Sequence, residues 1–442
     1  MGSEIERMKD DRLPVFDHEK GQLVKGGWAL MSRRHPFLEL MGVTVEPTED
    51  DNVRIRFLMR DNLCGHPGFQ ILQGGVVSCA IDILGGAVAS WHVIKDIQDR
   101  PVEEQLKRMG SVRTLDMRVD YLRPGSGKEF TVTGSVLRDG KKVLVIRNGW
   151  FSFRWTQIFD MGKIPSESFV LKARQTASGP QAPFAPPPLA EVVAAIREQR
   201  PAVVFAPHVE TASGMILPDD YLRAVGEAVR AVDGLFVLDC VASGTVWVDM
   251  VAANVDILIS APQKGWSASP CCALVALGER ARQRIDATTS TSFACDLKKW
   301  LQIMEAFENG GHAYHATMPT DALAAVRDVM LETEAYGFAR VCSEQQELGR
   351  RVREMLEARG FPSVAADGFK APGVVVSYTA DPEIQNGRKF LAVGLQTAAG
   401  VPLQCDEPAE FRTFRIGLFG LEKLHNPERT VNNLVRALDA LA

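Results

Sequence analysis

A lysine that follows an apolar run is the residue whose setting first suggests chemistry. The stretch "ILISAPQKGW" (257–266) places Lys264 just after mostly β-branched residues that predict a buried strand. Asp239 lies on another apolar run, 25 residues earlier, which is about one strand-helix-strand unit. A lysine and a carboxylate at neighbouring strand ends suit a pyridine-aldehyde cofactor, because the amine forms a Schiff base and the carboxylate holds the ring nitrogen protonated. The spacing alone leaves a solvated loop lysine as the alternative.

The elements that must position these residues alternate between strands and helices. Continuous apolar runs occur at 142–148, 202–208, 235–242, 255–261 and 271–277. Helical stretches such as "LPDDYLRAVGEAVRAV" (217–232) separate several of them. Apolar runs without alternation, joined by helices, predict a mainly parallel sheet covered on both faces. Functional groups collect at the strand ends of such sheets.

The first third of the chain has a different pattern. One strong helix is predicted over 72–94, and strands are predicted over 114–122 and 129–138. The segment "DMRVDYL" alternates polar and apolar residues, as a half-buried antiparallel strand does. This part is therefore predicted to have an α+β architecture.

Composition narrows the classes of protein. The 442 residues carry a formal net charge of −5 without a basic stripe, so we expect no nucleic-acid partner. The charged start predicts no signal peptide, and no apolar run reaches the roughly 18 residues of a membrane span. The eight cysteines form no C-x-x-C pair, which favours free thiols in a reducing cytoplasm and no metal site.

Six motifs in the later part carry a family resemblance. "NGWFSFRW", "HVETASG", "LDCVASG", "SAPQKGW", "YHATMP" and "FRIGLFG" occur in this order. From about 142 to the C-terminus the chain resembles class V aminotransferases, the alanine–glyoxylate and serine–pyruvate branch of the fold-type I pyridoxal-phosphate (PLP) enzymes. The resemblance makes Lys264 the Schiff-base lysine and Asp239 the ring-nitrogen partner, with Gln263 flanking the cofactor. It also implies that Phe151 stacks on the ring and that Thr211 lies near the ring oxygen.

The same resemblance implies a homodimer or a higher homo-oligomer. Tyr314 and Thr317 match residues that reach the cofactor phosphate from the partner subunit. Arg415 matches the arginine that clamps the substrate carboxylate, a task suited to its bidentate fork. The expected substrates are a small amino acid and a 2-oxo acid. Two structural alternatives remain, namely that Arg415 pairs with a structural carboxylate and that Phe151 is a core residue.

Members of that family carry a further segment before the "NGWF" motif, in which a small-residue turn opens a helix and binds the cofactor phosphate. Nothing upstream of 142 resembles it. We therefore expect an aminotransferase-like domain that is truncated at its N-terminus and binds PLP weakly.

The earlier part has its own resemblance over about 30–142. "HPGFQILQGGVVSCAIDILGG" followed by "TLDMRVDYLRPG" resembles the hotdog-fold acyl-CoA thioesterases of the phenylacetate-pathway type. It implies that Asp82 acts as base or nucleophile and that Thr114 lies near the attacking water. Gly74 and Gly75 open the helix, where N–H groups can polarise a thioester carbonyl. No cofactor is expected in this domain.

Two positions depart from the thioesterase pattern, and the pattern is also incomplete. Gln73 stands where many members have histidine, and His66 lies near a position where many have asparagine. The chain enters the aminotransferase motifs before the last hotdog strand, which would leave an unpaired sheet edge.

The sequence thus predicts an α+β hotdog domain (1–142), followed by an α/β PLP-transferase-like domain with a mainly parallel sheet (143–318) and a C-terminal α+β small domain (319–442). We expect a PLP-dependent aminotransferase fused to an acyl-CoA thioesterase-like domain. Two alternatives remain open: a thioesterase with a non-catalytic aminotransferase-like scaffold, and a catalytically defective fusion product.

Overall fold

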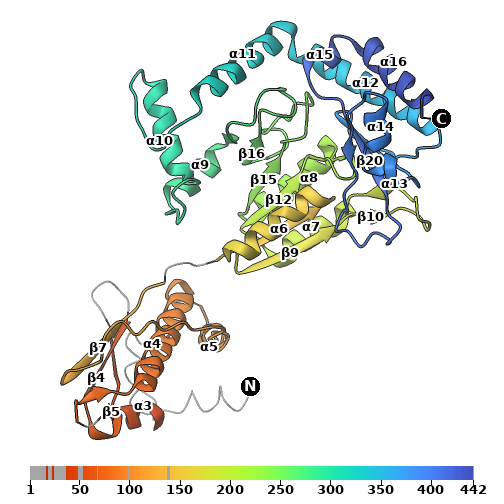
Figure 1. Ribbon diagram of the computed structural model, residues 1–442. Helices are drawn as coiled ribbons and strands as arrows, with labels where there is room; N and C mark the ends of the chain where they lie inside the picture. The colour runs from red at the N-terminus through yellow and green to blue at the C-terminus, as the bar shows by residue number, and fades with distance from the viewer. Residues whose placement is uncertain are drawn as a thin grey trace. The chain divides into compact units, whose positions relative to one another are not determined.

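The computed structural model describes residues 16–17, 22–23, 36–47, 53–66, 68–97, 100–136 and 140–441. The chain separates into two compact units, Met1–Asp139 and Gly140–Ala442 (Figure 1). The strand that begins at Lys142 belongs to the sheet of the second unit. The border between the units therefore lies three residues before the position 142 at which the sequence motifs placed it.

The first unit contains one long helix and short strands. Its elements are β1 (Phe16–Asp17), β2 (Gln22–Leu23), α3 (Pro36–Met41), β3 (Thr44–Pro47), β4 (Val53–Leu58), η1 (Asp61–Leu63), β5 (Cys64–His66), β6 (Ile71–Leu72), α4 (Gly74–Ile94), η2 (Lys95–Ile97), α5 (Val102–Met109) and β7 (Glu129–Thr133). Three of the strands form an antiparallel sheet in the order β3-β4-β7.

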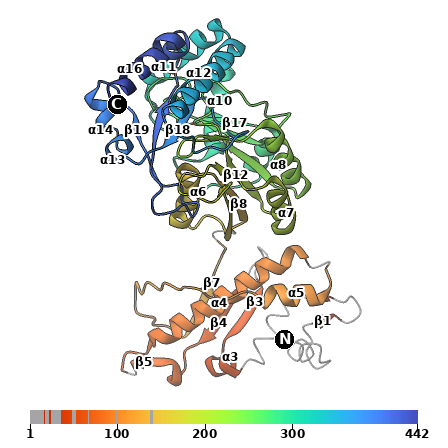
Figure 2. The same ribbon diagram turned by 90° about the vertical axis from the view of Figure 1, so that its right-hand side faces the viewer.

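Helix α4 and this sheet share one hydrophobic core. Side chains of β4 alternate, so that Val53, Ile55 and Phe57 are buried while the intervening residues are not. From α4, Leu84 and Val88 pack into the same core. Figure 2 shows α4 running alongside β3 and β4. Among the described residues α4 is the one helix long and apolar enough to cross a membrane, and one third of its apolar window is buried in the unit.

The prediction of a strand over 114–122 is wrong. The structure has no regular element between Ser111 and Leu122, and Leu115 and Leu122 are 96% and 88% exposed. A strand needs a ladder partner, and no described strand pairs with this segment. The strand predicted over 129–138 is confirmed as far as Thr133, residues 134–136 are irregular, and 137–138 lie outside the described residues. The hotdog fold itself stays a prediction.

The second unit begins with a six-stranded sheet. Its elements up to the end of that sheet are β8 (Lys142–Arg147), α6 (Trp150–Gly162), β9 (Glu167–Lys172), β10 (Arg174–Gln175), β11 (Phe184–Ala185), α7 (Leu189–Gln199), β12 (Val203–Pro207), β13 (Val209–Glu210), β14 (Met215–Ile216), α8 (Asp219–Ala231), β15 (Leu235–Asp239), β16 (Ile257–Ser260) and β17 (Leu274–Leu277). The strand order is β17-β16-β15-β12-β8-β9. Every pairing is parallel except that of β16 with β17. The predicted mainly parallel sheet is confirmed.

Burial decreases from the middle of this sheet toward β17. Leu144 on β8, Val204 on β12 and Phe236 on β15 are fully buried in a core that α7 and α8 cover. All four residues of β16 are only partly buried, so the prediction of a buried strand before Lys264 is wrong in degree. The reason is that β16 pairs on one side with β17, which is an edge strand among the described residues.

The rest of the unit is mostly helical. Its elements are α9 (Glu279–Asp286), α10 (Leu297–Glu308), α11 (Thr320–Tyr336), α12 (Phe338–Ala358), β18 (Val374–Tyr378), α13 (Pro382–Gln385), α14 (Arg388–Ala392), β19 (Ala398–Ala399), β20 (Thr413–Gly417), α15 (Leu421–Leu424) and α16 (Pro427–Asp439). A small antiparallel sheet has the order β18-β20-β19. Helices α11 and α12 are separated by Gly337 alone, whose φ of 106° is left-handed.

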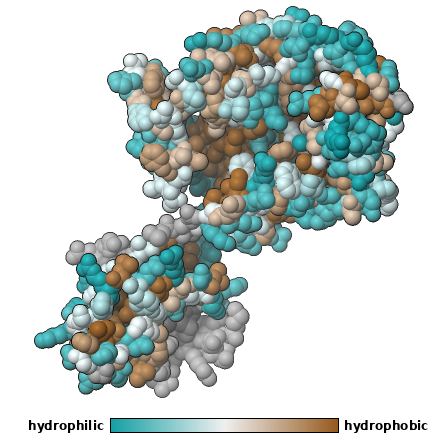
Figure 3. Space-filling view, viewed as in Figure 1, coloured by the Kyte–Doolittle hydropathy of each residue, from teal (hydrophilic) through white to brown (hydrophobic). Residues whose placement is uncertain are grey.

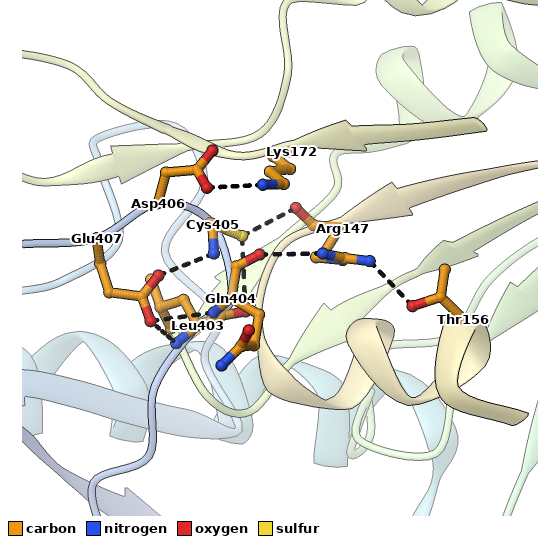
Figure 4. Close-up of polar contacts among 8 residues, drawn as sticks. All are labelled: Arg147, Thr156, Lys172, Leu403, Gln404, Cys405, Asp406 and Glu407. Carbon is orange, nitrogen blue, oxygen red and sulfur yellow. Dashed lines mark hydrogen bonds and ion pairs between the residues drawn. The ribbon is translucent and has the colours of Figure 1, made fainter. Parts of the chain in front are cut away.

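A loop ties the small sheet to the large one (Figure 4). The Glu407 carboxylate accepts the backbone N–H groups of Leu403, Gln404 and Cys405 at 2.6–3.0 Å. Arg147 at the end of β8 donates to the Gln404 carbonyl at 3.2 Å and to the Thr156 hydroxyl of α6 at 2.9 Å. Lys172 of β9 also pairs with Asp406. These contacts fix the chain that leads into β20.

Close packing of α8 makes Gly226 a sensitive position. A methyl group there would overlap the carbonyl oxygen of Ala253. We expect Gly226→Ala to lower the free energy of unfolding by about 1–3 kcal/mol through overpacking. The exposed neighbour Glu227→Ala, on the same helix, should stay within about 0.5 kcal/mol of the original chain. Urea unfolding of both variants measures the difference, and equal midpoints would contradict this packing.

Candidate functional site

Parallel pairing brings the predicted cofactor residues to one edge of the large sheet. Asp239 pairs in register with Pro207 on β12 and with Ile259 on β16. The carboxyl ends of three strands therefore coincide. His208 and Thr211 follow the first strand, Asp239 ends the second, and Lys264 follows the third, as the sequence predicted.

Asp239 lies in a poorly solvated place. Its Oδ1 accepts the Val241 N–H at 3.0 Å, and the Trp155 side chain also donates to the carboxylate. Burial raises the pKa of Asp239 to about 6, and the negative charge of Glu210 acts in the same direction. A carboxylate with this pKa can exchange a proton near neutral pH.

Lys264 lies in a tight turn after β16. Gly265 packs so closely on the Gly244 backbone that a side chain would overlap it. The Lys264 Nζ lies 5.9 Å from the centroid of the Phe419 ring. Burial lowers the pKa of Lys264, and the charge of Arg415 lowers it further. Both effects favour the neutral amine, which is the nucleophilic form.

Arg415 reaches the same site from the small sheet. On β20 it pairs with Val376 of β18, and its Nε donates to the Ala399 carbonyl at 2.8 Å. Its guanidinium carbon lies 5.7 Å from the Phe151 ring centroid. No carboxylate in the described part of the chain forms an ion pair with Arg415, which argues against the structural-pair alternative. Burial lowers its pKa, while Glu210 opposes this.

Sequence reasoning missed Glu210. This carboxylate is fully buried and receives four hydrogen bonds, three from the first turn of α6 and one from the backbone N–H of Ala212. Its charge acts on both Asp239 and Arg415. The signal was present in "HVETASG", where an acidic residue stands among small and apolar residues directly after a strand.

The remaining residues of this edge differ in exposure. Thr211 is buried and Gln263 is exposed. Phe151 is partly buried in the first turn of α6 and packs beside a buried core, so both readings of its role survive. The Asn148 carboxamide is 1% exposed, and neither of its polar atoms has a partner among the described residues.

The structure does not bring Tyr314 and Thr317 to this edge by any described contact. They lie on the segment between α10 and α11 and bond to each other, with 3.2 Å between their oxygen atoms. Tyr314 is 78% exposed, and Phe293, Met304 and Phe307 nearby are also exposed. Figure 3 shows apolar surface in a hollow of this unit, in the region of α9 and β16.

In the first unit the structure brings Asp82 and Thr114 together. The Thr114 hydroxyl donates to the Asp82 Oδ1 at 2.7 Å, although the two residues belong to different segments. Both side chains are exposed. The hydrogen bond fits the predicted pair of a carboxylate and a hydroxyl near an attacking water.

The other predicted thioesterase residues gather at the start of α4. Gln73 is the N-cap, and its Oε1 accepts the Gly75 N–H, so this donor is already occupied. Exposed His66 lies on β5, and the adjoining Gly65 packs against Gln73. At a rise of 1.5 Å per residue, Asp82 is about 10 Å along the helix from Gly75. One copy of the unit therefore does not bring the carboxylate and the helix N-terminus together.

Comparison with known proteins agrees with this division. No family model matches the chain. The N-terminal part is 37% identical over 115 residues to the medium/long-chain acyl-CoA thioesterase YigI of Escherichia coli K12, covering 25% of this chain and 72% of that protein. The later part is 25% identical over 307 residues to the small subunit of a soluble hydrogenase from Synechococcus, and 24% identical over 317 residues to rat alanine–glyoxylate aminotransferase. These two alignments cover 69% and 70% of this chain and 74% and 72% of those proteins.

A solved structure defines the fold of the second unit. The crystal structure of alanine–glyoxylate aminotransferase from Nostoc sp. superposes with a TM-score of 0.58 at 23% identity, covering 69% of this chain and 76% of that chain. The chain is thus a fusion of a thioesterase-like part with a part that has the aminotransferase fold. Through its N-terminal part it belongs to the family of the YigI acyl-CoA thioesterase. The predicted two-part assignment is confirmed.

The raised pKa of Asp239 makes a prediction about stability. In the unfolded chain its pKa returns toward 3.8, so burying the ionised carboxylate costs free energy only above that pH. Relative to Asp239→Asn, the original chain should therefore lose stability as the pH rises from about 4 to about 6. The ceiling is about 3 kcal/mol at 1.36 kcal/mol per pKa unit. Unfolding at pH 4 and pH 8 measures this, and a constant difference would contradict the raised pKa.

Proposed function

We propose that the second unit moves an amino group between a small amino acid and a 2-oxo acid with PLP as cofactor. The observation that carries this proposal is that Asp239 and Lys264 lie at the carboxyl ends of neighbouring strands, with Arg415 of the small sheet reaching the Phe151 ring and acting on the charge of Lys264. The aminotransferase fold and the relatives named above support it.

The residues of this edge fit the ring of PLP. Lys264 has the lowered pKa of an amine that can hold an aldehyde carbon. Asp239 supplies a poorly solvated carboxylate, and Phe151 offers an aromatic face. The Asn148 carboxamide adds unpartnered hydrogen-bonding groups. When bound, the cofactor supplies the electron sink that makes the α-proton of an amino acid removable.

Three side chains then have distinct tasks. Arg415 has no ion pair among the described residues, so its guanidinium can take the substrate carboxylate and orient the α-carbon. Asp239 holds the proton on the ring nitrogen. With the cofactor bound, the Lys264 amine would carry the proton of the α-carbon, because burial and the charge of Arg415 both lower its pKa.

The described residues of this edge offer fewer hydrogen-bond donors to the cofactor phosphate than to the ring. The N-terminus of α6, the helix start at this edge, is filled by the Glu210 carboxylate and does not offer its N–H groups to an anion. Tyr314 and Thr317 are exposed, so we infer that they contact the cofactor phosphate of a second copy of the chain. We therefore propose weak PLP binding that depends on a homodimer.

Covalent trapping tests this function. Borohydride reduction with PLP should fix the cofactor on Lys264, and peptide mapping should find the label there. Lys264→Gln should lose the label, whereas the exposed Lys299→Gln should keep it. Label spread evenly over surface lysines would refute the assignment and would favour a scaffold or a defective fusion.

A second function, acyl-CoA hydrolysis by the first unit, is favoured by a separate observation. The 2.7 Å hydrogen bond from Thr114 to Asp82 places a hydroxyl on a carboxylate that could activate water. Membership of the YigI family supports this proposal. The hotdog fold proposed for this unit would bring Gly74 and Gly75 to the thioester carbonyl. Gln73 would have to release the Gly75 N–H first.

Replacement of the carboxylate tests this second function. Asp82→Asn keeps the shape of the side chain and removes the base, so hydrolysis of medium-chain acyl-CoA should fall by about 10²–10⁴-fold. Asp116→Asn, an exposed aspartate two residues after Thr114, should leave the rate unchanged. Thiol release from acyl-CoA measures both variants, and equal rates would remove Asp82 from the mechanism.

A further inference from the structure

The Glu210 carboxylate is the most completely buried charged group at the edge of the large sheet. Its exposed fraction is 0%, and it lies on β13, directly before Thr211. Two backbone N–H groups donate to its Oε1, that of Phe151 at 3.3 Å and that of Ala212 at 3.0 Å. From Ser152 the backbone N–H and the hydroxyl donate to Oε2, at 2.9 Å and 2.8 Å.

The direction of these hydrogen bonds identifies Glu210 as an acceptor. The Ser152 hydroxyl oxygen receives the N–H groups of Asn148 and Gly149 at 2.9 Å and 3.1 Å. Both of its lone pairs are then used, so the hydroxyl cannot accept a proton from Glu210. Its own proton has two acceptors, Oε2 of Glu210 at 2.8 Å and the Gly149 carbonyl at 3.0 Å, and the carboxylate is the nearer. The three backbone N–H groups donate to Glu210 in either case, and the helix N-terminus adds a favourable dipole. Burial raises the pKa of Glu210, and the four donors oppose this.

The same hydrogen bonds join two segments that flank the proposed cofactor ring. Phe151 is the aromatic residue of the site, and its N–H is held directly by Glu210. Ala212 follows Thr211, so the second Oε1 contact fixes the other segment. Without the carboxylate, the first turn of α6 would have unpaired N–H groups and no tie to the β13 segment.

We propose that Glu210 is a positioning residue for the cofactor, one that holds Phe151 and Thr211 at a fixed separation from each other. It touches neither substrate nor cofactor. Its charge also stabilises the Arg415 cation, and it disfavours the ionised form of Asp239. This inference rests on the proposed PLP function and adds a residue to it.

The test compares two buried carboxylates of the same unit. Glu210→Gln keeps the size of the side chain and removes the charge. Asp256→Asn is the matched control, because Asp256 is 3% exposed, accepts the Phe236 N–H at 2.8 Å and pairs with Arg280. It precedes β16, whereas Lys264 follows that strand, so the control lies at the opposite end of the sheet.

Hydrogen exchange in the cofactor-free protein is the first measurement. In Glu210→Gln the amides of Phe151, Ser152 and Ala212 should exchange about tenfold faster or more, while Asp256→Asn should leave them unchanged. The second measurement is PLP titration with visible circular dichroism. Only Glu210→Gln should weaken binding, by about tenfold or more, and change the signal per bound cofactor, as expected for losing about 1.5–3 kcal/mol of charged hydrogen bonding.

Each outcome decides one point. Unchanged affinity and dichroism in Glu210→Gln, with the original chain binding PLP on Lys264, would overturn this inference alone. An equal loss of affinity in Asp256→Asn would also overturn it, because general destabilisation would then explain both. No binding by the original chain would overturn the proposed function and this inference with it. If Glu210→Gln does not fold, Ser152→Ala removes the hydroxyl contact to Oε2 and keeps the backbone one. It should weaken PLP binding in the same direction, and unchanged binding there would overturn the inference.

Discussion

The parallel register of β8, β12, β15 and β16 is the constraint on which the second unit depends. Parallel strands run in the same direction, so their carboxyl ends lie at one edge of the sheet. Residues that are far apart in the chain therefore come to the same edge. Asp239 aligns with Pro207 and Ile259 because the strands pair in register, and Lys264 lies in the turn that follows β16 at the same end of the sheet. A shift of one residue in any pairing would turn the side chains of that strand to the other face.

The charges at this edge have to be considered together, because each changes the free energy of the next. Lys264 and Arg415 repel each other, which lowers the pKa of the lysine. Glu210 offsets that positive charge and raises the pKa of Asp239. Burial strengthens all of these effects, since a low dielectric weakens screening. The arrangement costs folding free energy, and four hydrogen bonds to Glu210 offset part of that cost.

The exposure of each strand depends on the strands and helices that pack beside it. β8, β12 and β15 have strands on both sides and helices over them, so their apolar runs are buried. β16 has an edge strand beside it and is only partly buried, although its sequence is just as apolar. In the first unit, 114–122 has the alternation of a strand and no ladder to join, so it stays irregular and exposed. A hydrophobic pattern shows that a segment can form a buried strand. Whether it does so depends on a neighbouring strand or helix that can pack against it.

The sequence by itself determined the division into two parts, the parallel sheet, the α4 helix, and the strand ends that carry Asp239 and Lys264. These features are encoded locally, in periodicity and in motifs. Only the tertiary structure decided that Glu210 caps α6, that Thr114 bonds to Asp82, that Gln73 occupies the Gly75 N–H, and that Tyr314 lies exposed. The physical reason is that each of these depends on a contact between side chains and backbone groups whose meeting is set by packing. Local pattern fixes what each segment can form, and the folded chain fixes what each side chain touches.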